Sequence, residues 1–308
     1  MKAATAKKSA RHIAPAVAAT IGIYDGVHAG HRVVLKELLK CPGRKKVFVF
    51  FSNPKKSGDI VTNAMERKNI LAEMGLDSVM LKIEQYWKMS AGDFLKKVLI
   101  KKYRVRRLVI GEDFVFGRKR EGTVGKLKKW ARESGVAVSV VKTKTLGGCK
   151  ISTTRIKKLI SHSKTFLAAQ LMGRPYTVSG KKVRGKGIAG TLGFPTVNLI
   201  PEKHKAVPEG VFTAEVICKA GRFPAVVNSG SAPTFGIKKV LEFYALSGYS
   251  PEILKCGNFK ILFGKFIRKQ KKFTTKERLA ARIKKDVQFA VASGTDKSYY
   301  QRIRYGKN

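Results

Sequence analysis

The chain has 308 residues, 44% of them hydrophobic, and its 64 Lys and Arg against 20 Asp and Glu give a formal net charge of +44. This length suits two domains of ordinary size, and no apolar run approaches the length of about 18 residues that spans a bilayer, so we expect no membrane-spanning segment. The basic residues are spread over both halves of the chain rather than gathered in a tail or stripe, which argues against a dedicated nucleic-acid module and predicts only non-specific attraction of polyanions.

The first predicted strand and helix enclose a turn rich in glycine and histidine. Residues 16–23 are apolar enough for a buried strand, and apolar positions within 33–39 mark one side of a following helix. The turn between them holds Gly22, Asp25, Gly26, His28, Gly30 and His31. The start of a helix that follows a strand favours anions, and glycines let the backbone approach a nucleotide closely. Because imidazoles can donate hydrogen bonds to charge developing on a phosphoryl group, we interpret the segment as a phosphate-handling turn.

Strand and helix patterns alternate along the first half of the chain. Predicted strands cover residues 47–52, 78–83, 107–110 and 136–141. Predicted helices cover residues 63–75, 91–102, 126–134 and 151–160, the last opening on Ser152 or Thr153. This alternation predicts a doubly wound parallel sheet, that is, a Rossmann-like α/β domain over residues 1–160.

The pattern changes after residue 160. Residues 161–172 suit a short helix and linker, and glycine-punctuated apolar strands follow at 176–180, 210–218, 223–228, 240–246 and 259–266. These strands suit antiparallel pairing, so we expect a β-barrel domain over residues 173–292, closed by an amphipathic helix at 276–291. Residues 293–308 are polar, and we expect a frayed C-terminal tail there.

Six motifs occur in the order found in one enzyme family. They are GIYDGVHAGH from Gly22, GEDFVFG from Gly111, ISTTRI from Ile151, GFPTVN from Gly193, NSGSAPTF from Asn228 and RKQKKF from Arg268. The first resembles the His-x-Gly-His signature of the nucleotidyltransferase superfamily. The whole set resembles bacterial bifunctional riboflavin kinase/FMN adenylyltransferase, also called FAD synthetase, over about residues 16 to 292.

The resemblance implies that the first domain transfers the adenylyl group of ATP to the phosphate of FMN. His28 and His31 would act as catalytic residues on the ATP phosphates, in a nucleotide site that also includes Gly22, Asp25, Gly26, Gly30, Asp113, Thr153 and Thr154. Lys157 departs from the family pattern, which usually has Arg at this position. Lys keeps the charge but loses the planar fork that grips phosphate bidentately. A riboflavin kinase with an impaired adenylyltransferase domain is therefore one alternative.

The second domain resembles the riboflavin kinase module, which phosphorylates riboflavin with ATP and Mg²⁺. By this resemblance Thr196 and Asn198 bind Mg²⁺ and the ATP phosphates, behind a phosphate flap that includes Gly185 and Gly187. Mg²⁺ is a hard cation that takes oxygen ligands, which suits a Thr hydroxyl together with nucleotide oxygens. The reaction needs a base for the ribityl 5′-hydroxyl, and Glu242 matches the family's catalytic Glu by position.

The flavin pocket is expected from the same resemblance. It implies that Asn228, Phe235 and Arg268 bind flavin, although Lys269 and Gln270 replace the family's usual acidic pair. Riboflavin, FMN and ATP are therefore the expected small-molecule partners, with the flavins as substrates and products.

A polyanion- or RNA-binding protein on the same scaffold is an alternative of a different class. The net charge of +44 motivates it. A binding protein, however, has no need for His28, His31, Thr196 and Glu242 together, so the motifs favour the enzyme.

The cysteines bear on the compartment. Cys41, Cys149, Cys218 and Cys256 lie far apart in the sequence, with neither a Cys-x-x-Cys pair nor the spacing of a zinc site. We expect them to be reduced thiols of a cytoplasmic protein.

Overall fold

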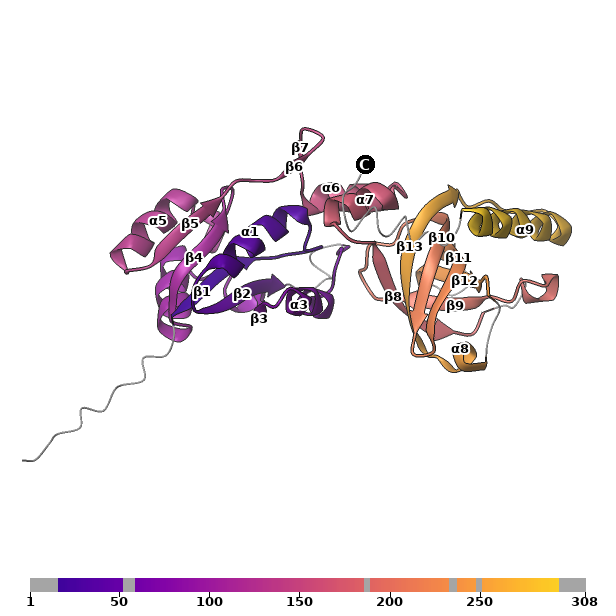
Figure 1. The fold of residues 1–308 in the computed structure, drawn as a ribbon, viewed down its shortest axis with the longest axis horizontal. Coiled ribbons are helices and arrows are strands. Elements are labelled where there is room, and N and C mark those ends of the chain that lie inside the picture. The colour runs from indigo at the N-terminus through magenta and orange to yellow at the C-terminus, as the bar shows by residue number, and fades with distance from the viewer. Residues whose placement is uncertain (1–15, 52–58, 186–188, 233–236, 248–250, 294–308) are drawn as a thin grey trace, which may run out of the picture. The chain divides into compact units, whose positions relative to one another are not determined.

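The computed structural model describes residues 16–51, 59–185, 189–232, 237–247 and 251–293 (Figure 1). The chain divides into two compact units that are not continuous in sequence. The first comprises Met1–Ile23, Val33–Phe51 and Leu71–Thr143, and the second comprises Tyr24–Arg32, Ser52–Ile70 and Lys144–Asn308. The glycine- and histidine-rich turn therefore belongs to the second unit, although it directly follows the first strand.

The first unit is built on a five-stranded parallel sheet in the order β3–β2–β1–β4–β5. The strands are β1 Val17–Gly22, β2 Arg44–Phe51, β3 Asp77–Lys82, β4 Val105–Gly111 and β5 Ala137–Val141. β1 lies at the centre of the sheet, and all its residues except Gly22 are buried. The strand order reverses between β1 and β4, and open parallel sheets bind ligands at such a switch point. The predicted doubly wound sheet is thus confirmed.

The helices of this half occur where the periodicity predicts them. They are α1 Ala29–Lys40, α3 Ala64–Glu73, α4 Ala91–Asp93 and α5 Val124–Glu133, with the short 3₁₀ turns η1 Ile83–Gln85 and η3 Arg118–Arg120. Gly75, with φ of 75°, follows α3 in the left-handed conformation of a C-terminal glycine. The helix expected over 91–102 is present, but it is not an α-helix throughout: α4 continues as a π-helix, η2 Phe94–Lys102. The apolar residues Phe94, Leu95, Val98 and Leu99 are buried in this wider helix, and hydrophobic periodicity alone does not distinguish it from an α-helix.

The second unit contains a closed antiparallel barrel in the order β10–β11–β12–β9–β8–β13, next to a small hairpin and several helices. Its strands are β8 Thr177–Val183, β9 Val197–Pro201, β10 Gly210–Cys218, β11 Gly221–Ala232, β12 Ile237–Ala245 and β13 Asn258–Arg268. Its helices are α6 Thr153–Ser161, α7 Thr165–Met172, α8 Pro251–Lys255 and α9 Lys276–Ala292, and the hairpin pairs β6 Thr145–Leu146 with β7 Cys149–Lys150. The barrel is confirmed, but β9, α8 and the hairpin were not predicted, because each is too short to show a clear period.

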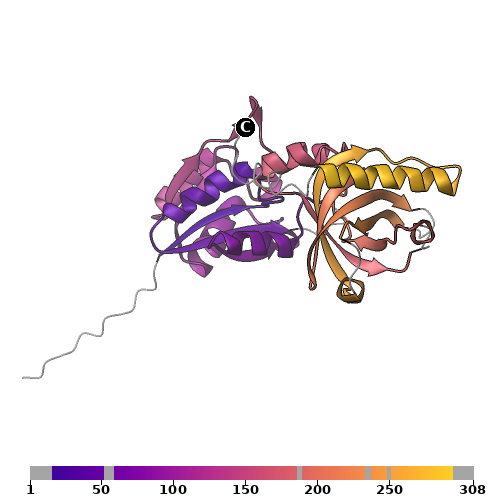
Figure 2. The same ribbon diagram turned by 45° about the vertical axis from the view of Figure 1, so that its right-hand side comes forward.

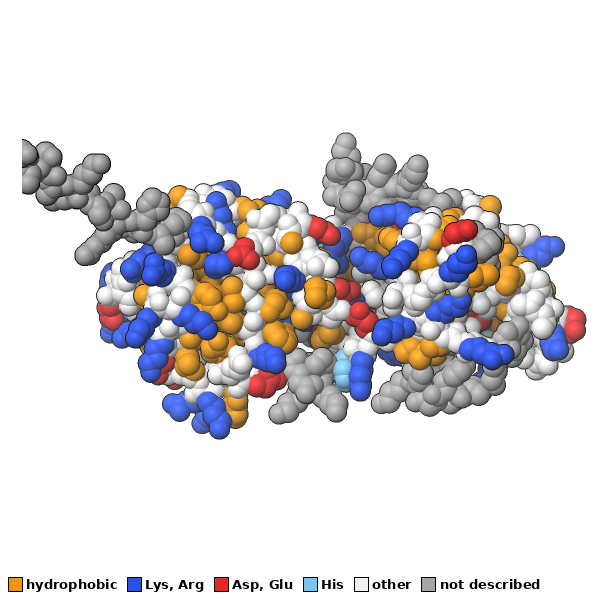
Figure 3. All heavy atoms as spheres, turned by 90° about the horizontal axis from the view of Figure 1, so that it is seen from below, with side chains coloured by type: hydrophobic (Ala, Val, Ile, Leu, Met, Phe, Trp, Pro, Cys, Tyr) orange, Lys and Arg blue, Asp and Glu red, His pale blue; other side chains and the backbone are white. Residues whose placement is uncertain are grey.

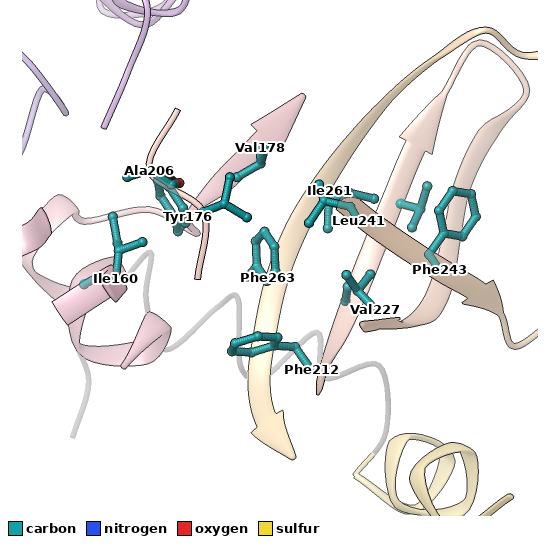
Figure 4. Close-up of a cluster of buried hydrophobic side chains, with 14 of the residues drawn as sticks. Ile160, Tyr176, Val178, Ala206, Phe212, Val227, Leu241, Phe243, Ile261 and Phe263 are labelled. Atoms are coloured by element: carbon teal, nitrogen blue, oxygen red, sulfur yellow. Dashed lines mark hydrogen bonds between the residues drawn. The ribbon is translucent and has the colours of Figure 1, made fainter. Parts of the chain in front are cut away.

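The barrel interior is filled by alternate residues of its strands (Figure 4). Phe212 and Phe263 meet edge to face at 5.2 Å between ring centroids, and Leu241, Phe243 and Val227 are fully buried with them. Since successive side chains of a strand point to opposite faces, the residues between these positions lie on the outer face. This alternation positions the second candidate site.

The amphipathic helix α9 packs beside the barrel, as predicted (Figure 2). Val287 and Ala290 of α9 contact Val211 and Val226 of the barrel strands. Thr275 caps the helix by accepting a hydrogen bond from the backbone N–H of Arg278. The expected polar tail begins here, and residues 294–308 of it lie outside the described residues.

Lys and Arg side chains are scattered over the face seen in Figure 3 and do not gather in one patch. Among the described residues, no helix is both long and apolar enough to cross a membrane.

Candidate active sites

The turn between β1 and α1 has an unusual backbone. Tyr24, Gly26 and Val27 all have positive φ, at 53°, 84° and 38°, and the Val27 N–H donates a 3.0 Å hydrogen bond to the Tyr24 carbonyl oxygen. A β-branched residue such as valine rarely adopts this region, so surrounding contacts must hold the turn in shape.

Asp25 is the centre of those contacts. One carboxylate oxygen accepts hydrogen bonds from the Thr62 backbone N–H at 2.7 Å and the Thr62 hydroxyl at 3.1 Å, and the other accepts from the Val61 N–H at 3.2 Å. Arg67 lies 3.4 Å away and Lys157 3.5 Å away as ionic partners. The carboxylate is almost fully buried and its oxygens are occupied by these protein groups. Lys157, the residue in the family's Arg position, therefore pairs with Asp25.

The segment that binds Asp25 is itself attached to the connection between β9 and β10. The Ile60 N–H donates to the His204 carbonyl oxygen at 2.7 Å, and the Ala206 N–H donates to the Ile60 carbonyl oxygen at 2.9 Å. Buried Lys205 forms an ion pair with Glu66, and burial lowers the pKa of Lys205. The turn is thereby supported by residues remote from it in sequence.

His28 and His31 stack on each other, with ring centroids 3.6 Å apart and planes inclined by 15°. The His31 backbone N–H donates to His28 Nδ1 at 3.2 Å, so a neutral His28 carries its proton on Nε2. Burial lowers the pKa of His28 to about 4, against a partial offset from the Asp25 charge. Burial and the neighbouring His28 also hold the pKa of His31 well below its usual value. Both rings are therefore neutral near pH 7, and the buried Nδ1 of His31 has no hydrogen-bond partner within the part of the chain that the structure describes.

The first turn of α6 lies against the same loop. The Ser152 hydroxyl caps α6 by accepting from the Arg155 N–H at 3.2 Å, which settles the two predicted helix starts in favour of Ser152 as the cap. The Thr153 hydroxyl donates to the Asp25 carbonyl oxygen at 2.9 Å. Thr154 is its neighbour in the first turn. The third motif of the sequence is thus brought to the first motif.

Two further contacts close this arrangement. A Cβ at Gly30 would lie 3.2 Å from the His28 ring and 3.4 Å from the Ile151 carbonyl oxygen, so the backbone passes close to both. Arg174 donates a 2.8 Å hydrogen bond to the Gly26 carbonyl oxygen.

Two further residues of the predicted nucleotide site lie at the ends of sheet strands. Gly22 is the last residue of β1. Asp113 follows β4 in the first unit, and its carboxylate lies 3.1 Å from where a Cβ on Gly111 would be.

The second candidate site is a row of polar residues across three barrel strands. Asn198 of β9 is opposite Glu242 of β12, and Glu242 is opposite Asn228 of β11. Directly opposed residues share a face, and because Leu241 and Phe243 point into the core, this row lies on the outer face of the barrel. All three side chains of the row are half-buried.

Thr196 and Gly185 complete the row at one end. The Thr196 hydroxyl donates a 2.5 Å hydrogen bond to the Glu242 carboxylate. A Cβ at Gly185 would lie 2.1 Å from the Asn198 amide, so a larger residue just after β8 would displace the Asn198 side chain. Gly187, expected in the same flap, lies outside the described residues.

Gln270 completes the other end. Its amide donates to the Asn228 side-chain oxygen at 3.0 Å, and it lies so close to Gly230 that a Cβ there would clash with it at 2.0 Å. Arg268 instead pairs with the buried carboxylate of Asp286 on α9, at 2.7 Å. Phe235, expected in the flavin pocket, lies outside the described residues.

Several of these positioning residues were not identified from the sequence. Thr62, Arg67 and Arg174 support the first site, and Gln270 supports the second. Thr62 and Arg67 belong to no recognised motif, and their partners lie far away in the chain. Gln270 stood out only as a departure from the family's acidic pair.

Comparison with known proteins matches both halves of the chain. The sequence model of the FAD synthetase family matches residues 10–155, and that of the riboflavin kinase family matches residues 172–293. A bifunctional riboflavin kinase/FMN adenylyltransferase of Escherichia coli (strain K12) is 32% identical over 282 residues, covering 87% of this chain and 89% of that protein. The protein of the same name from Haemophilus influenzae is 30% identical over 301 residues, covering 92% of this chain and 96% of that one.

A solved structure shares the fold of nearly the whole chain. It is described as a macrolide-efflux protein from Streptococcus pneumoniae, with a TM-score of 0.79, 24% sequence identity, and coverage of 90% of this chain and 94% of that one. At this identity the likeness concerns the fold alone.

Proposed function

The chain belongs to the family of bifunctional riboflavin kinase/FMN adenylyltransferases, and from this premise we propose that it converts riboflavin to FMN and FMN to FAD, using ATP in both steps. The observation that carries the proposal is that the models of two separate families match successive halves of the chain. Each half contains one of the two clusters of polar residues described above. An RNA- or polyanion-binding protein is not favoured, because neither cluster is needed for that purpose.

In the adenylyl transfer, a phosphate oxygen of FMN attacks the α-phosphorus of ATP and pyrophosphate leaves. No covalent enzyme intermediate is needed, so the protein acts by positioning the two substrates and stabilising charge. The proton of His28 lies on Nε2, which can donate to a phosphate oxygen. Nδ1 of the stacked His31 ring has no hydrogen-bond partner among the described residues. Because both rings are neutral, they can donate hydrogen bonds to developing charge without the ionic cost of a buried cation.

The remaining first-site residues act mainly on the shape of the turn. Asp25 holds the turn through Val61 and Thr62, and Thr153 ties α6 to the Asp25 carbonyl oxygen. Gly22, Gly26 and Gly30 let the backbone approach phosphate, while Thr154, Asp113 and Lys157 complete the ATP contacts. Lys157 would divide its charge between Asp25 and the nucleotide.

In the kinase reaction, Glu242 accepts the proton of the ribityl 5′-hydroxyl as that oxygen bonds to the γ-phosphorus of ATP and ADP leaves. The carboxylate is oriented by the Thr196 hydroxyl at 2.5 Å and by its place between Asn198 and Asn228. One carboxylate oxygen accepts the Thr196 hydrogen bond, and we assign the other to the substrate hydroxyl.

The residues at this site fit Mg²⁺. The Thr196 hydroxyl directs its hydrogen to Glu242, which leaves its oxygen lone pairs for a hard cation, and Asn198 supplies an amide oxygen in the same row. Thr196 and Asn198 would hold the ion, which neutralises charge on the ATP phosphates when bound. Gly185 and Gly187 would let the phosphate flap approach them.

Flavin binding is proposed beside the same row. Asn228 lies next to Glu242, within reach of the ribityl chain, and Phe235 would contact the ring. Arg268 is proposed to act on the pocket through α9, which it binds at Asp286.

We assign adenylyl transfer to residues 1–160 and phosphorylation to residues 173–292, joined by 161–172. The net charge of +44 is expected to attract polyanions non-specifically. The free cysteines suit a cytoplasmic location. Retention on heparin that disappears at modest salt would agree with this surface, whereas salt-resistant binding of a defined RNA would contradict it.

One assay tests the function directly. Purified protein is incubated with riboflavin, ATP and Mg²⁺, and FMN and FAD are separated by chromatography. We expect both products, with FMN appearing before FAD. If FMN forms without FAD, the proposed adenylyltransferase activity is rejected. If correctly folded protein forms neither product, both proposed activities are rejected.

A further inference from the structure

A buried lysine in the connection between β9 and β10 contacts the start of α3. The Lys205 side chain is only 1% exposed, and its ammonium pairs with the Glu66 carboxylate at 2.5 Å. The same ammonium lies 5.6 Å from the ring centroid of Tyr176. Lys205 and Glu66 are 139 positions apart in sequence, yet both belong to the second compact unit. The ion pair therefore joins the barrel connection to the segment that supports the turn of His28 and His31.

Glu66 is one half of a reciprocal cap at the start of α3. The Asn63 side-chain oxygen accepts a hydrogen bond from the Glu66 backbone N–H at 2.7 Å, and the Glu66 carboxylate accepts one from the Asn63 backbone N–H at 2.9 Å. This pair of hydrogen bonds is the arrangement of a capping box. The Asn63 amide also donates to the carboxylate of Glu202, which follows β9 directly. Both residues of the cap are thus bound by the barrel connection.

The residues that bind Asp25 lie on either side of this cap. Just before it, the Val61 and Thr62 backbone N–H groups donate to the Asp25 carboxylate at 3.2 and 2.7 Å. Just after it, the Arg67 guanidinium lies 3.4 Å from the same carboxylate. A shift of the start of α3 would therefore move these groups relative to Asp25 and to the turn that Asp25 holds.

We propose that Lys205 is a positioning residue for adenylyl transfer. Its ion pair with Glu66 fixes the start of α3, and through Asp25 it fixes the turn that holds His28 and His31. The inference rests on the proposed adenylyl transfer at that turn, and it gives a residue of the barrel domain a part in that reaction. Because misplacing catalytic groups by about 1 Å can lower a rate about 100-fold, the pair can control the reaction without touching a substrate.

The first test is Lys205→Met in the full chain, which keeps an apolar stem beside Tyr176 and removes the charge. FAD formation from FMN and FMN formation from riboflavin are measured separately. The kcat of adenylyl transfer should fall about 10- to 100-fold, while the KM for FMN and the kinase turnover stay near the parent values. A parent-like adenylyl kcat, or an equal fall in kinase turnover, would overturn the proposal.

A second variant separates positioning from stability. Lys205→Met leaves the Glu66 charge buried and unpaired, which lowers stability. In Lys205→Met with Glu66→Gln no unpaired charge remains, so resistance to urea should recover. If Lys205 positions the turn, adenylyl transfer stays low in this double variant although stability recovers. Recovery of the parent rate together with stability would show that Lys205 is merely structural.

Lys239→Met is the matched control. The Lys239 ammonium donates to the Val207 carbonyl oxygen at 3.2 Å in the same connection, and it pairs with Asp59 at 3.9 Å. Adenylyl transfer in this variant should remain near that of the parent protein. A fall as large as in Lys205→Met would assign the effect to the connection in general and contradict the role of the Lys205–Glu66 pair.

The titration of His28 gives a readout that does not depend on activity. The chain has five histidines, and NMR of histidine-labelled protein, assigned with His28→Gln, follows this ring alone. If the turn loosens in Lys205→Met, water reaches the ring and its pKa should rise from about 4 towards 6.5. An unchanged His28 titration would overturn the inference. A parent protein that makes no FAD would instead reject the proposed function, and the titration would still test the position of the turn.

Discussion

The His28–His31 turn and the Asn198–Glu242–Asn228 row are positioned by different kinds of interaction. The turn is held by a buried carboxylate, Asp25, whose partners come from distant parts of the chain. The row follows from strand register, because opposed residues of β9, β12 and β11 necessarily share one face of the barrel.

This difference has consequences for mutation. A polar network loses its geometry when any one buried partner is removed, because the groups left behind are unsatisfied. A row set by backbone pairing keeps its geometry when one side chain changes, so a substitution there removes chemistry with little change of structure. The following substitutions test this contrast.

We expect the largest effect from Glu242→Gln. The amide keeps the shape of the side chain but cannot accept the substrate proton, so conversion of riboflavin to FMN should fall about 10²- to 10⁴-fold. Conversion of supplied FMN to FAD should be largely unchanged, as measured by chromatography of each product. Glu215→Gln, on β10 of the same barrel, is the control and should retain kinase activity. Near-normal kinase turnover in Glu242→Gln would reject Glu242 as the base.

The double substitution His28→Ala with His31→Ala should stop FAD formation while FMN accumulates. Loss of the donors that we propose to face the ATP phosphates should lower adenylyl transfer about 10²- to 10³-fold. Steady-state rates with riboflavin and with FMN as separate substrates measure the two steps. Equal loss of both activities would show that the sites are not independent.

Stability should fall with acidity because of His28. Its pKa is about 4 in the folded protein against 6.5 in the unfolded chain, so the two states bind protons almost equally only well above pH 6.5. As the pH falls through 6.5 towards 4, the unfolded chain takes up a proton that the folded protein excludes, and the free energy of unfolding decreases. Between pH 7 and pH 5 the loss should be about 2 kcal/mol.

Urea denaturation of the parent protein and of His28→Gln over this pH range measures the effect. The variant lacks the titrating ring and should show a smaller slope with pH. Parallel slopes would mean that His28 titrates normally in the folded protein.

Thr62→Val should damage the turn without touching the barrel row. The substitution leaves the Gly26 N–H, which donates to the Thr62 hydroxyl at 2.7 Å, without its partner, and should cost about 1–3 kcal/mol of unfolding free energy. Adenylyl transfer should fall and kinase activity should persist. Thr213→Val removes a comparable acceptor of a backbone N–H in the barrel, from Lys265 at 2.9 Å, and is the control for general destabilisation. If both variants lower adenylyl transfer equally, Thr62 has no special role in the turn.

The smallest effect is expected from Lys157→Arg. An arginine fork can keep the Asp25 contact and still bind phosphate through its other N–H groups, so FMN adenylylation should rise a few-fold while kinase activity is unchanged. Lys158→Arg, one position along α6, is the matched control. Unchanged or lower adenylylation in Lys157→Arg would show that Lys157 does not weaken the first site.

Much of the fold could be predicted from local patterns in the sequence. Apolar runs and helical periods predicted the parallel sheet and the closing helix α9, because these elements are long enough to show their period. Short elements such as β9 were missed, although β9 carries Asn198. His28 and His31 were proposed from their spacing in a glycine turn, and Glu242 was proposed because it matches the family's catalytic Glu by position; their roles stay predictions.

What the sequence by itself determined was the order of elements and the identity of the motifs, since both depend on neighbouring residues. Only the tertiary structure decided which distant residues meet. It brought Arg67 and Lys157 to Asp25 and paired Arg268 with Asp286. Such contacts depend on how the units fold back on themselves to bury charge and satisfy polar groups, and no local spacing records that outcome.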